Sequence, residues 1–182
     1  MGFWKVYFSK MKGVTQAPPR AAWSEIVWSW IGAFLGIAAV AFTHYRILSG
    51  TDLVMVIGSF GASAVLIYGA IQSPLAQPRN LIGGHILSAI IGVTCYKVFH
   101  GEMWLAAALA VSTAIAAMHA TRTLHPPGGA TALIAVIGSE KVHRLGYLYA
   151  LIPAGLGALI MLVVAVLVNN LAPRRRYPEY WF

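Results

Sequence analysis

Acidic residues are scarce in this chain, which has five Asp and Glu against 13 Lys and Arg among 182 residues. Charged residues make up only 10% of the sequence, whereas ordinary soluble domains carry about 25%. No acid lies in the middle of an apolar run. Carboxylates inside a membrane typically mark cation pathways or proton relays. Their absence therefore argues against both.

Cysteine is nearly absent as well. The single Cys95 lies in an apolar run, so an intrachain disulfide is excluded and a packing role is expected. The sequence has no metal-ligand cluster, acid pair or GxSxG motif, so we expect neither an enzyme nor a bound metal or cofactor. The first 20 residues mix basic and aromatic residues without a long apolar core, so we also expect no cleavable signal peptide.

Apolar residues are abundant: 59% of the chain is hydrophobic and the mean hydropathy is +0.72. These values are typical of a polytopic, all-helical membrane protein, and this length favours one domain. The net charge of +8 lies mainly in tails and loops. It therefore indicates orientation in a lipid bilayer rather than nucleic-acid binding.

We expect three regions. Residues 1–22 form a peripheral amphipathic, basic arm, residues 23–171 a single transmembrane domain, and residues 172–182 a basic-aromatic cytoplasmic tail. The transmembrane domain is predicted to contain about six segments, and Pro153 should kink the last of them. They span residues 24–44, 52–71, 80–99, 102–121, 128–138 and 145–170. A four-crossing arrangement, with the second or fifth segment re-entrant, remains open.

The basic residues favour one orientation. Placing both termini in the cytoplasm puts nine Lys and Arg on that side and four on the other. We therefore expect an even number of crossings, in the inner membrane of a bacterium.

Small residues recur every four positions in three segments. Such stripes allow close helix packing, within one chain or in a homo-oligomer. They comprise Gly32 and Gly36; Gly84, Ser88 and Gly92; and Ala106, Ala110 and Ala114.

Two short stretches resemble each other: GASAVLIYGA from Gly61 and GATALIAVIG from Gly129. Each follows an irregular bend and precedes a polar loop and a long apolar segment. This predicts two three-segment repeats, residues 24–99 and 102–170, related by inversion.

Both bends, GSFGAS and HPPGGAT, predict short helices that begin inside the membrane. Such a start presents unpaired N–H groups and the positive end of the helix dipole, which suits an anion. We therefore predict an anion site built from the residues of both bends. The candidates are Ser59, Phe60, Gly61, Ser63, His125, Pro126, Pro127, Gly128, Gly129 and Thr131.

Five further polar residues lie near the bends: Arg79, Asn80, His85, His119 and Arg122. They are donors or bases that could line an anion pathway. Positive-inside placement of the arginines and bundle packing of the histidines remain open. A haem held between His85 and His119 is a further alternative.

The motif LHPPGGATAL at 124–133 resembles the signature of the HPP family of integral membrane proteins, and SPLAQPRNLIGGH at 73–85 is similar to its second block. The resemblance covers roughly residues 24–168. It implies four membrane helices and a transporter-like role, with nitrite transport associated with chloroplast and cyanobacterial members. It assigns no role to individual residues.

The sequence thus predicts a membrane transporter for a small monovalent anion, with nitrite the best candidate. Alternatives are an anion channel, a haem- or quinone-binding membrane subunit, and a purely structural scaffold. A homo-oligomer is also expected.

Overall fold

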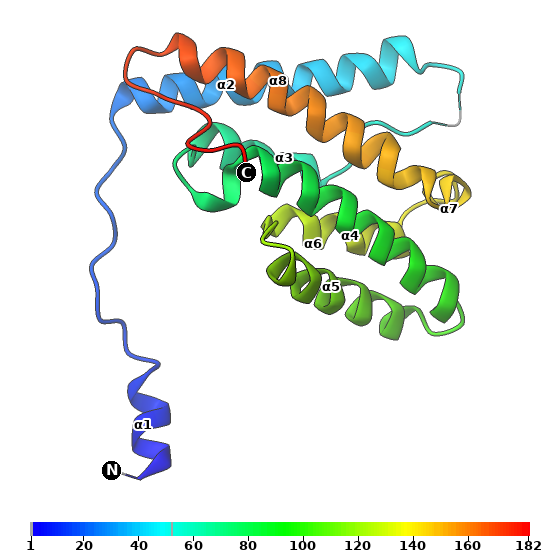
Figure 1. Cartoon of the computed structure of the whole chain (residues 1–182), viewed down its shortest axis with the longest axis horizontal. Coiled ribbons are helices and arrows are strands. Elements are labelled where there is room, and N and C mark those ends of the chain that lie inside the picture. The colour runs from blue at the N-terminus through cyan, green and yellow to red at the C-terminus, as the bar shows by residue number, and fades with distance from the viewer. Residues whose placement is uncertain (1, 52) are drawn as a thin grey trace.

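The structure is a computed structural model that describes residues 2–51 and 53–182, and every regular element in this part of the chain is helical (Figure 1). The helices are α1 (Phe3–Ser9), α2 (Trp23–Phe42), α3 (Ser59–Ala64), α4 (Pro78–Phe99), α5 (Met103–Ala120), α6 (Pro126–Ile137), α7 (Glu140–Leu145) and α8 (Leu156–Leu171). π-Helical turns at Thr43–Ile47, Val65–Gly69 and Ala150–Gly155 extend α2, α3 and α8, and a single 3-10 turn covers Pro74–Ala76.

Four of these helices are long and apolar enough to cross a bilayer: α2 and α8 with their extensions, α4 and α5. The other two apolar helices, Ser59–Gly69 and Pro126–Ile137, are shorter. At 1.5 Å per residue each covers about 17–18 Å of a hydrocarbon core of roughly 30 Å. The prediction of six membrane segments is therefore supported only in its coarser form, four long helices and two short ones.

The second predicted segment begins later than expected. Its predicted start at Asp52 lies outside the described residues, Leu53–Gly58 includes no regular helix, and α3 begins at Ser59 within the glycine-serine bend. Helices thus follow the order long, short, long twice along the chain. The inverted relation between the two halves remains a prediction.

The bundle has two layers, with α8 along α2 on one side and α4, α5 and α6 on the other (Figure 1). Helix α3 contacts both layers through α2 and α6. The start of α2 and the end of α8 lie at the same end of the bundle, as an even number of crossings requires. Helix α1 is joined to the bundle by an extended segment and is fully exposed.

The small-residue stripes serve packing within this chain. A Cβ atom at Gly32 would lie 2.6 Å from the Tyr68 ring, and one at Gly84 would lie 2.6 Å from Cβ of His125. On α5, Ala106, Ala110 and Ala114 are fully buried in one apolar cluster with Cys95. The predicted packing role of Cys95 is confirmed. Pro153 also kinks its helix as predicted, because Ile152 leaves helical backbone angles there.

Candidate functional site

The two bends meet in the middle of the bundle, where α3 and α6 lie side by side in opposite directions. Ser59 pairs with Thr131, and Ser63 pairs with His125. The sequence accounts for both starts. Two prolines occupy the first turn of α6, where their missing N–H groups cost no hydrogen bond, and α3 begins directly after Gly58.

Ser63 joins two histidines from different helices. Its Oγ lies 2.7 Å from Nε2 of His85 on α4 and 2.9 Å from Nε2 of His125 at the start of α6. The two imidazole centroids are 5.1 Å apart. Nδ1 of His125 donates to the carbonyl oxygen of Leu75, at 2.8 Å. The loop before α4 thereby fixes one end of this group.

Thr131 extends the group on the other side. Its Oγ1 lies 2.7 Å from Nδ1 of His85 and 2.9 Å from Oγ of Ser59, with the Pro127 carbonyl a longer 3.3 Å away. The Phe60 ring packs edge-on against His85 at 5.2 Å. Tyr149 donates from its hydroxyl to the Thr131 carbonyl. Together, Ser59, Thr131, His85, Ser63 and His125 form what we call the hydroxyl–imidazole line.

The line is sealed from solvent, because each of its five side chains is at most 1% exposed. Within the described part of the chain, each buried side-chain nitrogen and oxygen atom has a hydrogen-bond partner. A bound anion would therefore have to replace one of the contacts of the line rather than enter an open cavity.

Several predicted site residues lie elsewhere. Gly61 is exposed, and Gly129 borders an apolar groove near Val111 instead of the line. Pro127 and Gly128 are buried, but Gly128 packs against Ser88 and Gly84 of α4, whereas Pro126 is exposed. A continuous backbone cradle through both glycine pairs is thus absent from this conformation of the described residues.

Of the predicted pathway residues, one belongs to the line and the others lie elsewhere. His85 belongs to the line, but His119 and Arg122 are exposed near the end of α5. Arg79 donates to the Thr121 carbonyl, and Asn80 donates to the Leu124 carbonyl. Both therefore hold the loop that leads to His125. The histidine that faces His85 is His125, not His119.

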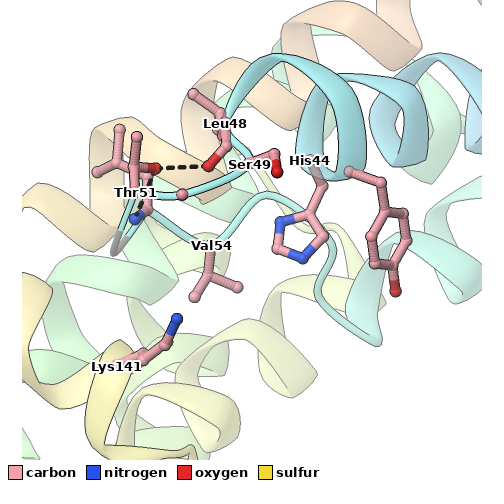
Figure 2. Close-up of a pocket in the computed structure, with 9 residues that line it drawn as sticks. His44, Leu48, Ser49, Thr51, Val54 and Lys141 are labelled. Atoms are coloured by element: carbon pink, nitrogen blue, oxygen red, sulfur yellow. Dashed lines mark hydrogen bonds between the residues drawn. The ribbon is translucent and has the colours of Figure 1, made fainter.

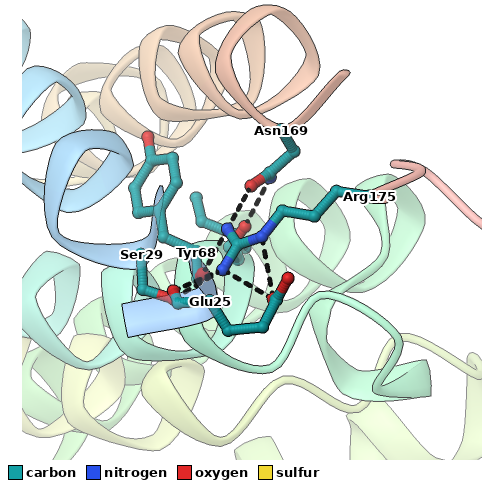
Figure 3. Close-up of polar contacts among 6 residues, drawn as sticks. Glu25, Ser29, Tyr68, Asn169 and Arg175 are labelled. Atoms are coloured by element: carbon teal, nitrogen blue, oxygen red, sulfur yellow. Dashed lines mark hydrogen bonds and ion pairs between the residues drawn. The ribbon is translucent and has the colours of Figure 1, made fainter. Parts of the chain in front are cut away.

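A second buried polar cluster, which we call the arginine clamp, was not predicted (Figure 3). Arg175 follows α8 and forms a 2.9 Å ion pair with Glu25 of α2. Its guanidinium also donates to the Tyr68 carbonyl and to Asn169 Oδ1, each at 3.1 Å, and to Ser29 Oγ at 2.8 Å. In sequence, Arg175 is the middle of three arginines and resembles a positive-inside tail. Only the polar Asn169 within an apolar helix signalled a buried contact.

The chain after Arg175 forms a strap across the loop before α4. Tyr177 donates to the Ala76 carbonyl at 2.7 Å, and the backbone N–H of Glu179 donates to Oε1 of Gln77 at 2.9 Å. Burial raises the pKa of the Tyr177 phenol, so it remains a neutral donor. The tail is therefore part of the folded domain and holds the loop that contains Leu75.

Cavities lie at both ends of the bundle. One of about 320 Å³ is bordered by His44, Thr51, Val54 and Lys141 at the end opposite the chain termini (Figure 2). His44 Nδ1 accepts from the backbone of Met55, in the segment that leads to Ser59. The other cavity, about 450 Å³, is bordered by residues 69–73 and by Glu25, Arg174 and Arg175. No residue of the hydroxyl–imidazole line borders either cavity.

Residues 18–178 match the family described as "HPP, transmembrane region". Two transmembrane proteins of Dictyostelium discoideum are similar to the chain, at 49% identity over 179 residues and 48% over 181 residues. The match covers 97% of this chain in each case, but only 57% and 63% of the relatives. No solved structure matches. The comparisons support an integral membrane protein, and because these relatives are eukaryotic they give no support to the predicted bacterial origin.

Proposed function

The chain belongs to the HPP family of transmembrane proteins, and on that premise we propose that it transports a small monovalent anion, with nitrite the best candidate. The observation that carries the proposal is the meeting of α3 and α6, two helices too short to span a bilayer. They run in opposite directions, and the start of each lies against the second turn of the other inside the bundle. Transporters commonly bind substrate where such interrupted helices begin.

The binding step uses the residues that the structure brings together. When α3 and α6 separate, the Ser59–Thr131 and Ser63–His125 contacts break, and the hydroxyls freed in this way can donate to an anion. The start of α6, with His125 as its N-cap, adds the positive end of its dipole. In this proposal the anion replaces the 2.9 Å contact between Ser63 and His125.

Alternating access fits the cavities better than an open channel does. A cavity at each end carries basic groups, with Lys141 and His44 at one end and Arg174 at the other, where Arg175 is paired with Glu25. The sealed line corresponds to a closed state. Inverted repeats, cytoplasmic termini and a homo-oligomer remain parts of the proposal. The packing of α8 along α2, like that of α4 along α5, supports the repeat.

The haem alternative receives less support. Its proposed second ligand, His119, is exposed on α5, and His85 and His125 share the Ser63 hydroxyl at short distances. These rings would have to move apart to accept a flat macrocycle.

The test is uptake into proteoliposomes of nitrite, nitrate, formate and chloride. We expect nitrite uptake above that of empty liposomes. Ser63→Ala should reduce it about tenfold or more, because it removes a hydrogen-bond donor worth roughly 1.5–3 kcal/mol to a charged partner. Ser112→Ala, on the exposed face of α5, is the matched control. Flux of none of the four anions would refute the proposal.

A further inference from the structure

The hydroxyl–imidazole line is continuous from Ser59 to the Leu75 carbonyl. Its five successive heavy-atom distances are 2.9, 2.7, 2.7, 2.9 and 2.8 Å. Every link lies within ordinary hydrogen-bonding range. Each of the three hydroxyls can accept and donate a proton through its oxygen, and each of the two imidazoles can do so through its two nitrogens.

The contact with Leu75 fixes the position of one hydrogen, and the direction in which the other groups donate follows from it and from the charge of His125. A carbonyl oxygen only accepts, so Nδ1 of His125 must carry a hydrogen. If His125 is neutral, its Nε2 accepts from Ser63, whose oxygen then accepts from Nε2–H of His85. Nδ1 of His85 accepts in turn from Thr131, whose hydroxyl then turns away from the Ser59 oxygen to which it donates in this structure. With both rings neutral, all donors from Thr131 onward therefore point towards Leu75.

The opposite polarity requires one additional proton. If Thr131 donates to Ser59, then Nδ1–H of His85 donates to Thr131, and Ser63 donates to Nε2 of His85. Nε2 of His125 must then donate to Ser63 while Nδ1 still donates to Leu75. His125 is an imidazolium in this state, and the two polarities differ by one proton.

We propose that the hydroxyl–imidazole line is a proton wire, and that the anion is carried together with a proton; this rests on the transport function proposed above. Once the Ser59 end of the line opens to water, a proton bonds to the Ser59 oxygen, whose own proton moves to Thr131. Each following group passes one proton on, until Nε2 of His125 gains one. The resulting imidazolium balances the charge of an anion bound beside it.

Release completes the proton balance. When α3 and α6 part towards the other side, the anion between Ser63 and His125 becomes open to water. His125 then loses its Nε2 proton to water as the anion leaves, and keeps Nδ1–H towards Leu75. Water also exchanges the tautomer of His85. One proton enters and one leaves in each cycle.

The surroundings allow this charge to appear only when it is compensated. Beyond the two histidines, the titratable group facing the line is Tyr149, whose hydroxyl donates to the Thr131 carbonyl. From α4, Arg79 is directed to the Thr121 carbonyl instead. The hydrogen bonds of the line involve no carboxylate in the described part of the chain, so the anion itself is the natural counter-charge.

The experiment uses proteoliposomes that contain a pH-sensitive dye, with the membrane potential clamped and the outside one pH unit more acidic. Nitrite and nitrate are the probes, and empty liposomes correct for passage of the free acids. For one proton per anion, the gradient should drive up to about tenfold accumulation. The lumen should acidify in step with uptake.

Two substitutions at Thr131 distinguish proton conduction by its hydroxyl from a role in packing. Thr131→Val keeps the shape but removes the hydroxyl, and should abolish most of the gradient-driven uptake and acidification. Thr131→Ser keeps the hydroxyl and should retain far more of both. Thr113→Val, on the exposed face of α5, is the matched control.

Four other outcomes are informative. Anion uptake without acidification, insensitive to the gradient, would overturn the wire and leave the transport function standing. If Thr131→Val retains gradient-driven uptake and acidification while Thr131→Ser loses them, Thr131 has a packing role and the wire is also overturned. Proton flux that needs the Thr131 hydroxyl but no anion would support the wire and refute anion transport. Flux of neither would refute both.

Discussion

The hydroxyl–imidazole line and the arginine clamp are both buried polar clusters that join segments distant in sequence, but they differ in charge. The line is built from hydroxyls and imidazoles that can be neutral, and one proton changes its state. The clamp is an ion pair with further donors directed at backbone carbonyls. Removing one partner of a buried ion pair leaves a charge uncompensated, whereas a lost hydroxyl leaves only a weaker unpaired group. The clamp is therefore suited to hold the structure together, and the line to change.

The largest effect is expected for Arg175→Met, which keeps much of the aliphatic stem and removes the guanidinium. Glu25, Asn169 and the Tyr68 carbonyl would lose their donor. We expect a loss of about 2–4 kcal/mol of stability, because two buried acceptors lose their donor while Glu25, whose side chain is 41% exposed, regains water. The measurement is thermal unfolding of the purified protein in detergent, with the exposed neighbour substitution Arg176→Met as the control. Equal midpoints for the two variants would show that the clamp is dispensable.

The next largest effect should come from Gly36→Ala. A Cβ atom there would collide with the Tyr68 hydroxyl, and a rigid aromatic ring held by the Met161 carbonyl cannot move easily. Overpacking of this kind costs roughly 1–3 kcal/mol. Gly69→Ala is the matched control, because a Cβ atom at Gly69 meets nothing within 4 Å. The same unfolding assay compares them, and equal stability would mean that α2 and Tyr68 separate readily.

Ser63→Ala tests the hydroxyl–imidazole line. It leaves a nitrogen on each of two buried histidines without its partner, which should cost about 1–3 kcal/mol. We expect the substitution to lower the unfolding midpoint less than Arg175→Met does, while reducing transport strongly. A greater loss of stability than in Arg175→Met would reverse the roles given to the two clusters.

The smallest effect is expected for Tyr177→Phe. It removes one 2.7 Å hydrogen bond from the strap to the Ala76 carbonyl, worth about 0.5–1.5 kcal/mol. Tyr180→Phe, at the longer and exposed 3.2 Å contact with the Pro74 carbonyl, should cost less. Hydrogen exchange of residues 71–77 would report a loosened loop. Unchanged exchange in Tyr177→Phe would show that the strap does not hold it.

Much of the line was predictable because its residues interrupt apolar sequence. Ser59, Ser63, His125 and Thr131 stand out at two bends, and a helix start inside a membrane needs polar partners. His85 was predicted as a pathway residue and is central to the line. The glycines are ambiguous in sequence, since close approach to a ligand and close approach to a helix require the same missing side chain. Gly128 serves the second purpose, against Ser88.

The clamp could not be predicted from sequence. Arg174, Arg175 and Arg176 are equivalent by the positive-inside rule, and which of them turns inward depends on where Glu25 and the end of α3 lie in space. The same applies to Leu75, whose role depends on a backbone carbonyl that any residue would supply. Four long helices and two short ones follow from segment length and bend chemistry. The pairing of their ends does not.

The clamp also bears on how the protein is made. Glu25 and Arg175 are separated by 150 residues, so α2 enters the membrane long before its partner is synthesised. At typical synthesis rates of about 5–20 residues per second, the delay is roughly 8–30 s. During this interval the insertion machinery holds a first helix whose carboxylate lacks its guanidinium. The bundle can close only after Arg175 has been synthesised, and ribosomes stalled before that residue should leave chains that quality-control proteases recognise as unfinished.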